Sequence, residues 1–228
     1  MITNKMSKRL RQIVELVDGK RVADIGCDHG KVVNYLLSHN IIDYAICSDI
    51  SLPSVKKAEE LLLYSKIDSS RYDIRHGDGL STVTYNDNID TIIIAGMGGK
   101  EIIHILSTAQ ILPETLILQP QKNEIEVKKY LINNGYHIVF DKIVEDSNKF
   151  YICLKCKKDS FVSDVNEFEL LFGKDNFVNY SKDFDNYLKF LQKKYQHIAS
   201  NITDCDRHNI DNMLESIEKA KDLFRSIQ

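Results

Sequence analysis

The sequence predicts an α/β fold, in which a doubly wound sheet of parallel strands is followed by a smaller helical part. Over the first 158 residues, short apolar segments alternate with amphipathic helical segments, the pattern of parallel strands joined by right-handed crossovers. Residues 159–228 show no strand pattern, and their apolar positions recur at steps of three and four. The length of 228 residues suits one domain with an appendage.

Each element follows from a local pattern. Leu10, Ile13 and Val14 share one face of an amphipathic helix that opens the chain over residues 5–17. We expect strands at the apolar segments 22–25, 44–47, 72–75, 91–95 and 116–118. We expect the intervening helices at 31–38, 54–64, 100–106 and 124–132.

The last part of the predicted sheet is a hairpin. Two longer β segments, 136–144 and 150–154, flank turn residues 145–148, which predicts an antiparallel strand added to the parallel sheet. Two amphipathic helices joined near 204–209 then form a coiled-coil-like antiparallel hairpin. We therefore divide the chain into a sheet domain, residues 1–158, and a helical hairpin, residues 159–228.

Composition limits the partners. A net charge of −3 gives no bulk attraction for nucleic acid, and 23 Lys against 7 Arg, with 28 Ile and 16 Asn, indicates a coding bias that makes single lysines weak evidence. No apolar run approaches the roughly 20 residues of a membrane span, and no leader opens the chain, so we expect a cytoplasmic protein.

The five cysteines are odd in number and lie in apolar segments, which is typical of reduced cytosolic thiols. Cys153, Cys156, Cys205 and His208 have zinc-like spacing. The first two lie three apart on a predicted strand and so face opposite sides. We expect no bound metal.

The first strand-to-helix turn carries the acids Asp24 and Asp28 and the glycines Gly26 and Gly30. Ligands bind at this edge of a doubly wound sheet, and glycines let the backbone approach them closely. The dinucleotide pattern G-x-G-x-x-G is absent, and two carboxylates would repel a pyrophosphate at the helix start. S-adenosylmethionine has an α-ammonium and a sulfonium but no phosphate, so the turn favours this cofactor. The alternative is a plain turn with solvated acids.

Two further acids follow strand ends. Asp49 ends the second predicted strand, 23 residues after Gly26, where an acid accepts hydrogen bonds from both ribose hydroxyls. Asp78 follows the third strand, where an acid accepts from the adenine amine. Alone, Asp49 could cap a helix and Asp78 could belong to an ordinary turn. Three acid-bearing strand ends in register, including Asp24, indicate the cofactor more specifically than any one of them.

Four motifs carry a family resemblance: ADIGCDHG at 23–30, GDGL at 77–80, IAGMGG at 94–99 and LQPQ at 118–121. Together they resemble the bacterial tRNA (adenine-22, N1)-methyltransferases, and residues 7–10 and the helical tail match as well. The resemblance implies a Rossmann-like class I methyltransferase sheet with helices on both faces and a C-terminal helical hairpin. The sequence departs from the family at Cys27 and Gly30, where Ser and Ala are usual.

The resemblance implies methyl transfer from S-adenosylmethionine to N1 of adenine 22 in the D-arm of tRNA, with S-adenosylhomocysteine as product. The expected cofactor-binding residues are Asp24, Gly26, Cys27, Gly30, Asp49, Ile50, Gly77, Asp78, Gly79, Ala95 and Gly96. Adenine N1 has an in-plane lone pair and the sulfonium is an activated leaving group. The protein therefore needs chiefly to align the atoms and exclude water.

The expected catalytic residues are Asp28, His29, Met97, Gly98, Gln119 and Pro120. The glycine-rich loop at Gly98 would let the target base approach the methyl group, unless its glycines only cap the next helix. Gln119 and Pro120 would form the floor of the pocket, and Asp28 or His29 would polarise the base. A paired adenine must be turned out of its helix. Tyr85 could then stack on it, or could be an ordinary surface residue.

Contact with tRNA must come from local basic clusters. The expected RNA-binding residues are Lys5, Lys8, Arg9, Arg11, Lys155, Lys189 and Lys193, with solvated lysine faces as the alternative. We expect a monomer. Two other functions stay open: methylation of a different RNA, a protein or a small molecule, and a non-catalytic RNA-binding module, which the three intact acids disfavour.

Overall fold

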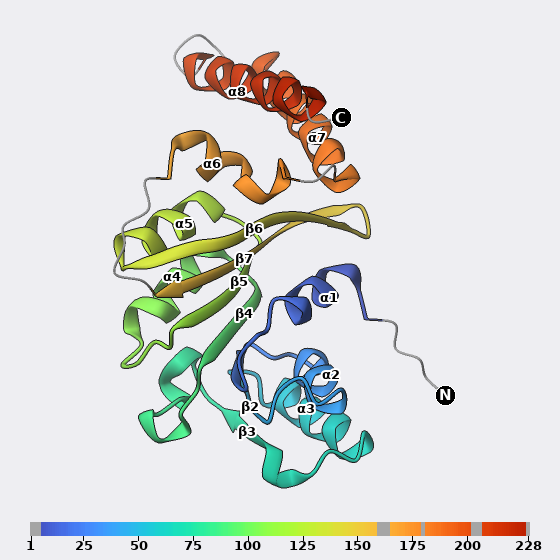
Figure 1. Ribbon diagram of the computed structural model, residues 1–228, viewed down its shortest axis with the longest axis vertical. Helices are drawn as coiled ribbons and strands as arrows, with labels where there is room; N and C mark the ends of the chain where they lie inside the picture. Colours follow the sequence, from blue (N-terminus) through green and yellow to red (C-terminus); the bar gives the residue numbers. More distant parts are fainter. Residues whose placement is uncertain (1–5, 159–164, 179–180, 202–206, 227–228) are drawn as a thin grey trace.

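The computed structural model describes residues 6–158, 165–178, 181–201 and 207–226. In this part of the chain a seven-stranded sheet runs in the order β3-β2-β1-β4-β5-β7-β6 (Figure 1). Its parallel strands are β1 (Arg21–Ile25), β2 (Tyr44–Asp49), β3 (Tyr72–His76), β4 (Thr91–Met97) and β5 (Thr115–Pro120). The hairpin strands are β6 (Tyr136–Asp146) and β7 (Lys149–Lys158), and β7 pairs antiparallel with β5. The predicted sheet with an antiparallel addition is confirmed.

Helices cover both faces of the sheet (Figure 1). One face carries α1 (Lys8–Glu15), α2 (Lys31–Ser38) and α3 (Leu52–Tyr64), and the other carries α4 (Gly99–Thr108) and α5 (Glu124–Asn133). Successive strand residues such as Val22 and Ala23 therefore enter two different core clusters. The connections contain the 3-10 turns η1 (Ser69–Arg71), η2 (Gly79–Thr82) and η3 (Tyr85–Asp87).

The predicted helical pair is present as α7 (Lys182–Ala199) and α8 (Arg207–Ser226), which lie side by side. The predicted joint at 204–209 falls partly on residues 202–206, outside the described residues. A short helix before the pair, α6 (Glu167–Phe172), and the turn η4 (Lys174–Asn176) were not predicted. Phe172, Phe184 and Leu188 are buried in the same core cluster as the α4–α5 face of the sheet. The domain boundary at residue 158 therefore stays a prediction.

A buried ion pair connects the sheet to α6. The Lys128 ammonium of α5 lies 2.6 Å from the Asp141 carboxylate of β6, and the two side chains are 1% and 5% exposed. The same ammonium donates a hydrogen bond to the Leu170 carbonyl (2.8 Å). Beside it, the Asn176 amide donates to the Asp141 carbonyl and accepts from the Ile143 amide. These polar contacts hold α5, β6 and the α6–η4 segment together.

Cys27, Cys47, Cys153 and Cys156 are buried free thiols. Cys153 lies in the core cluster beneath α1 and α2, and Cys156 lies in the cluster on the other face, as their spacing predicts. Among the described residues there is no group of three side chains able to hold a metal ion, and Cys205 lies outside them. In the same residues, no helix has both the length and the apolar character that crossing a bilayer requires.

Candidate active site

A cavity of about 350 Å³ opens at the carboxyl ends of β1, β2, β3 and β4. Eight of the predicted cofactor-binding residues line it: Gly26, Asp49, Ile50, Gly77, Asp78, Gly79, Ala95 and Gly96. The predicted catalytic residues Asp28 and Met97 line it as well. Five other lining residues, Ile25, Ser48, Glu101, Ile105 and Gln121, were not predicted from the sequence.

Gly26 makes the sharp exit from β1. Its amide donates a hydrogen bond to the Ser48 carbonyl (2.8 Å), and its φ of +72° lies in the left-handed region that favours glycine. A Cβ at this position would lie 2.0 Å from the Met97 methyl carbon. Glycine therefore brings the first turn close to the end of β4, where Ala95 and Met97 flank a break in the pairing with β5.

Asp49 is held in place by backbone amides. One carboxylate oxygen accepts from the Asp28 amide (3.0 Å) and the other from the Ser51 amide (2.8 Å). Each oxygen keeps a second acceptor site. The carboxylate is therefore fixed at the cavity wall in an orientation that can accept from two neighbouring hydroxyls.

Three predicted cofactor residues lie behind the cavity wall instead. Asp24 is 4% exposed, and burial, reinforced by the charges of Asp49 and Asp28, raises the pKa of its carboxyl to about 7. Cys27 is buried beside Cys47 in the core. Gly30 lies against α3, since a Cβ there would be 2.9 Å from the Ala58 Cβ. These residues shape the turn and do not line the cavity.

The cavity has a strongly negative wall. Its described lining residues include four carboxylates against one guanidinium: Asp28, Asp49, Asp78 and Glu101 against Arg9. Such a set repels a pyrophosphate and attracts a cation. S-adenosylmethionine, which carries both a sulfonium and an ammonium, fits this set of carboxylates.

Arg9 lies in this wall and was predicted only as an RNA contact. Its guanidinium donates to the side-chain oxygen of the fully buried Gln119 (2.7 Å) and lies over the Tyr151 ring, 5.2 Å from its centre. Its amide donates to Asp146 at the hairpin tip (3.0 Å). One signal in the sequence was available: Arg9 lies four residues before the buried Ile13, on the inward face of the helix.

The remaining predicted catalytic residues surround this wall. Gln119 is held by Arg9 beneath the surface, and Pro120 lines a neighbouring cavity. Gly98 precedes α4, and a Cβ at this position would meet no atom within 4 Å, so the loop is open there. His29 is absent from the cavity lining; its ring is 41% exposed, 3.4 Å from both the Asp28 carboxylate and the Lys57 ammonium.

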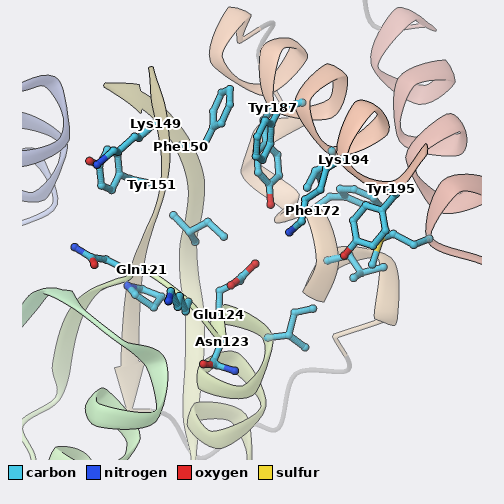
Figure 2. A pocket seen from close by; sticks show the side chains of 18 of the residues that line it. Gln121, Asn123, Glu124, Lys149, Phe150, Tyr151, Phe172, Tyr187, Lys194 and Tyr195 are labelled. Carbon is cyan, nitrogen blue, oxygen red and sulfur yellow. The ribbon is translucent and has the colours of Figure 1, made fainter. Parts of the chain in front are cut away.

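A second cavity, of about 660 Å³, lies between the β6–β7 hairpin, the start of α5 and helices α6–α8 (Figure 2). It shares Gln121 with the first cavity. Tyr85, the aromatic residue considered for stacking, is 78% exposed and lines a different hollow. No sequence pattern indicated the second cavity, because its lining comes from segments far apart in the chain.

The predicted RNA-binding lysines are partly engaged in ion pairs. Lys8 pairs with Asp183 (2.5 Å), Lys189 with Asp185 (2.5 Å), and Lys155, whose side chain is 12% exposed, with Asp18 (2.6 Å). Arg11 and Lys193 are exposed. Lys5 lies outside the described residues. Contacts of these residues with RNA stay predictions.

The sheet order and the acidic cavity at the strand ends define a Rossmann-like methyltransferase domain. A family model described as "Methyltransferase domain" matches residues 6–154. Within this class, the chain belongs to a family of tRNA methyltransferases.

Two curated relatives and one solved structure illustrate the similarity. The tRNA (adenine(22)-N(1))-methyltransferase of Bacillus subtilis is 32% identical over 151 residues, which is 64% of this chain but only 63% of that enzyme. A Mycoplasma genitalium protein assigned as a tRNA methyltransferase is 34% identical over 158 residues, 67% of this chain and 70% of that protein. The structure of M. capricolum TrmK with S-adenosylhomocysteine has a TM-score of 0.86 at 22% identity and covers 96% of this chain and 99% of that one.

Proposed function

We infer that this protein transfers a methyl group from S-adenosylmethionine to N1 of adenine 22 in tRNA and releases S-adenosylhomocysteine. The observation that supports the cofactor is the cavity with four carboxylates, in which Asp49 is already oriented by two amides. The choice of acceptor atom and of tRNA position rests on the similarity to the Bacillus subtilis enzyme. Methylation of another acceptor stays the alternative.

We assign the cofactor contacts to the cavity residues by their chemistry. Asp49 would accept from the ribose hydroxyls, and Asp78 from the adenine amine. Asp28, with the buried Asp24 behind it, would provide the negative charge for the α-ammonium. Gly26 and Gly96 line the cavity with backbone alone, which leaves room beside Met97.

When bound, S-adenosylmethionine supplies a methyl group that the sulfonium already activates. The residues of this chain align the acceptor nitrogen with that methyl group and exclude water. Methylation at N1 makes the adenine cationic, so the positive charge moves from sulfur to the base. Asp28 and Glu101 line the cavity and stabilise that charge, while Arg9 keeps the buried Gln119 amide in one orientation beneath it.

We propose that the protein acts as a monomer in the cytoplasm, with tRNA as its partner. The four buried free thiols are consistent with a reducing compartment. We further propose that residues 159–228 help to dock the tRNA. Sedimentation of the protein with and without tRNA tests the oligomeric state, since a monomer gives a complex of one protein per RNA.

The decisive experiment is transfer of radiolabelled methyl groups to tRNA transcripts, followed by nucleoside analysis. We expect 1-methyladenosine in a transcript with adenine 22 and none when guanosine replaces that adenine. Asp49→Ala should abolish the signal at low S-adenosylmethionine concentration. Equal labelling of both transcripts would contradict the assigned position, and labelling of protein or small molecules alone would favour the alternative.

A further inference from the structure

The cavity of about 660 Å³ beside the acidic site has a distinct chemistry. Aromatic side chains from β7 and α7 line it: Phe150, Tyr187, Phe190 and Tyr195. The Phe150 ring lies 5.3 Å from both the Tyr187 and the Phe190 rings, at tilts of 60° and 39°. Phe190 is nearly half exposed. These rings form an accessible aromatic wall on which a planar group can stack.

Charged groups complete this cavity. Its described lining residues include three lysines, Lys122, Lys149 and Lys194, against one carboxylate, Glu124. The balance is opposite to that of the acidic site, so this cavity suits a polyanion. Figure 2 shows the Glu124 carboxylate and the Lys194 ammonium directed into the space beside the Tyr187 hydroxyl. The negative charge of Glu124 adds to burial in raising the pKa of Tyr187 and of Tyr195, as expected if it faces them.

The cavity adjoins the place of methyl transfer but is separated from it. Gln121 lines both cavities, and its backbone N–H donates to the Met97 carbonyl (2.9 Å). The Arg9 guanidinium lines the acidic site and lies over the Tyr151 ring, which is on the opposite side of β7 from Phe150 (Figure 2). A group among Tyr187, Phe190 and Tyr195 is therefore beyond this wall, while the target N1 must contact the methyl group itself.

We propose that the aromatic cavity binds one unstacked nucleobase of the tRNA, next in sequence to the target adenine; this inference rests on the proposed function. The base stacks on the wall formed by Phe150 and Phe190, and Lys194 contacts its phosphate. Glu124 accepts a hydrogen bond from the amino group of the base, which favours adenine, guanine or cytosine over uracil. Seating this neighbour holds the target adenine turned out toward the acidic site.

The test combines Phe150→Leu with abasic tRNA transcripts, and affinity is measured apart from methylation. We expect Phe150→Leu to weaken tRNA binding about tenfold, the loss of one stacked base, and to leave S-adenosylmethionine binding unchanged. An abasic residue at one of the two neighbours of the target should weaken tRNA binding by the wild-type protein by a similar factor. On that abasic transcript, Phe150→Leu should bind with the same affinity as the wild-type protein. Tyr64→Leu, at an exposed ring outside the cavity, is the matched control.

Glu124→Gln gives a second measurement that does not depend on the aromatic wall. Uridine at the identified neighbour should weaken tRNA binding by the wild-type protein. Glu124→Gln should reduce this preference against uridine at least fivefold. Glu126→Gln, a change on the same helix outside the cavity, should retain it. Three results would each overturn the inference. The first is unchanged tRNA affinity in both Phe150→Leu and Glu124→Gln. The second is that the affinity losses from Phe150→Leu and from an abasic residue multiply at both neighbours of the target, and the third is that Phe150→Leu has no further effect when the target adenine itself is abasic. Failure of the wild-type protein to methylate any tRNA would instead overturn the proposed function.

Discussion

Asp49 is prepared for its ligand by the backbone around it. The Asp28 and Ser51 amides each hold one oxygen, so the carboxylate loses little freedom when a ligand arrives. Charged hydrogen bonds of this kind contribute about 1.5–3 kcal/mol each.

We therefore expect Asp49→Ala to weaken S-adenosylmethionine binding by about 30-fold or more, because two ribose hydroxyls lose their acceptor. Isothermal calorimetry measures the change. Asp43→Ala removes an exposed carboxylate just before the amino end of β2, at the opposite end of the strand from Asp49. This variant should bind S-adenosylmethionine as the wild type does. Equal affinity of Asp49→Ala and wild type would refute the ribose role.

Asp24 predicts a pH dependence. Its pKa of about 7 arises from burial and from the charges of Asp49 and Asp28, and a cationic ligand nearby favours its ionised form. S-adenosylmethionine affinity should therefore rise about tenfold from pH 5.5 to 7, below the range in which the ligand ammonium titrates. Asp24→Asn should flatten this profile, and a wild-type profile that is already flat would contradict the prediction.

The same carboxyl group links pH to stability. Because the folded pKa of Asp24 lies above its unfolded value, the folded state binds this proton more tightly. The resulting contribution to the free energy of unfolding is present below about pH 4 and is lost as the pH rises through about 7. Asp24→Asn should remove this pH dependence along with that of cofactor binding.

At the scale of elements, one buried ion pair connects the α6 segment to the sheet. Lys128 of α5 contacts both Asp141 of β6 and the Leu170 carbonyl of α6. Burial raises the pKa of Asp141, against the attraction of the Lys128 ammonium, so the pair lies in a region where an unpaired charge is costly.

We expect Asp141→Ala to lower the free energy of unfolding by about 3–5 kcal/mol, because it leaves the Lys128 ammonium buried without its counterion. Urea denaturation measures the loss. The double variant Lys128→Met/Asp141→Leu should recover most of it, since no charge is then buried. Glu215→Ala, which removes a carboxylate from an exposed ion pair, should leave stability unchanged. A small effect of Asp141→Ala alone would contradict this account.

The elements that the sequence predicted correctly are those whose burial it encodes directly. Strands β1, β2, β4 and β5 are covered by helices on both faces and so read as short apolar runs. The helix α6 has six residues and is stabilised by tertiary contacts such as the Lys128 hydrogen bond, which no local pattern reveals. The same limit explains Arg9, whose role depends on how α1 docks beside β5 and β7.

Across the whole molecule, opposite charges are sorted into two adjacent cavities. The net charge of −3 averages over an acidic cavity, where four carboxylates face one guanidinium, and an aromatic cavity with three lysines and one carboxylate. A small cation and a polyanion therefore have separate favourable places a short distance apart.

This separation predicts different responses to salt. With about three phosphate contacts, tRNA affinity should fall roughly 20- to 40-fold between 50 and 200 mM salt. S-adenosylmethionine carries one net positive charge, so its affinity should change only a few-fold over the same range. Filter binding and calorimetry measure the two, and a salt-independent tRNA affinity would contradict local phosphate contact.

The hydrogen bonds of α1 determine the order in which contacts can form in the nascent chain. Its partners Gln119, Asp146 and Asp183 lie 110, 137 and 175 positions further along the sequence. At about 5–20 residues per second, synthesis takes on the order of ten seconds or more from Arg9 to the last of them. Arg9, the part of the active site that leaves the ribosome first, therefore waits for its partners, and a nascent chain carries an incomplete cofactor site until β5 and the β6–β7 hairpin have been made.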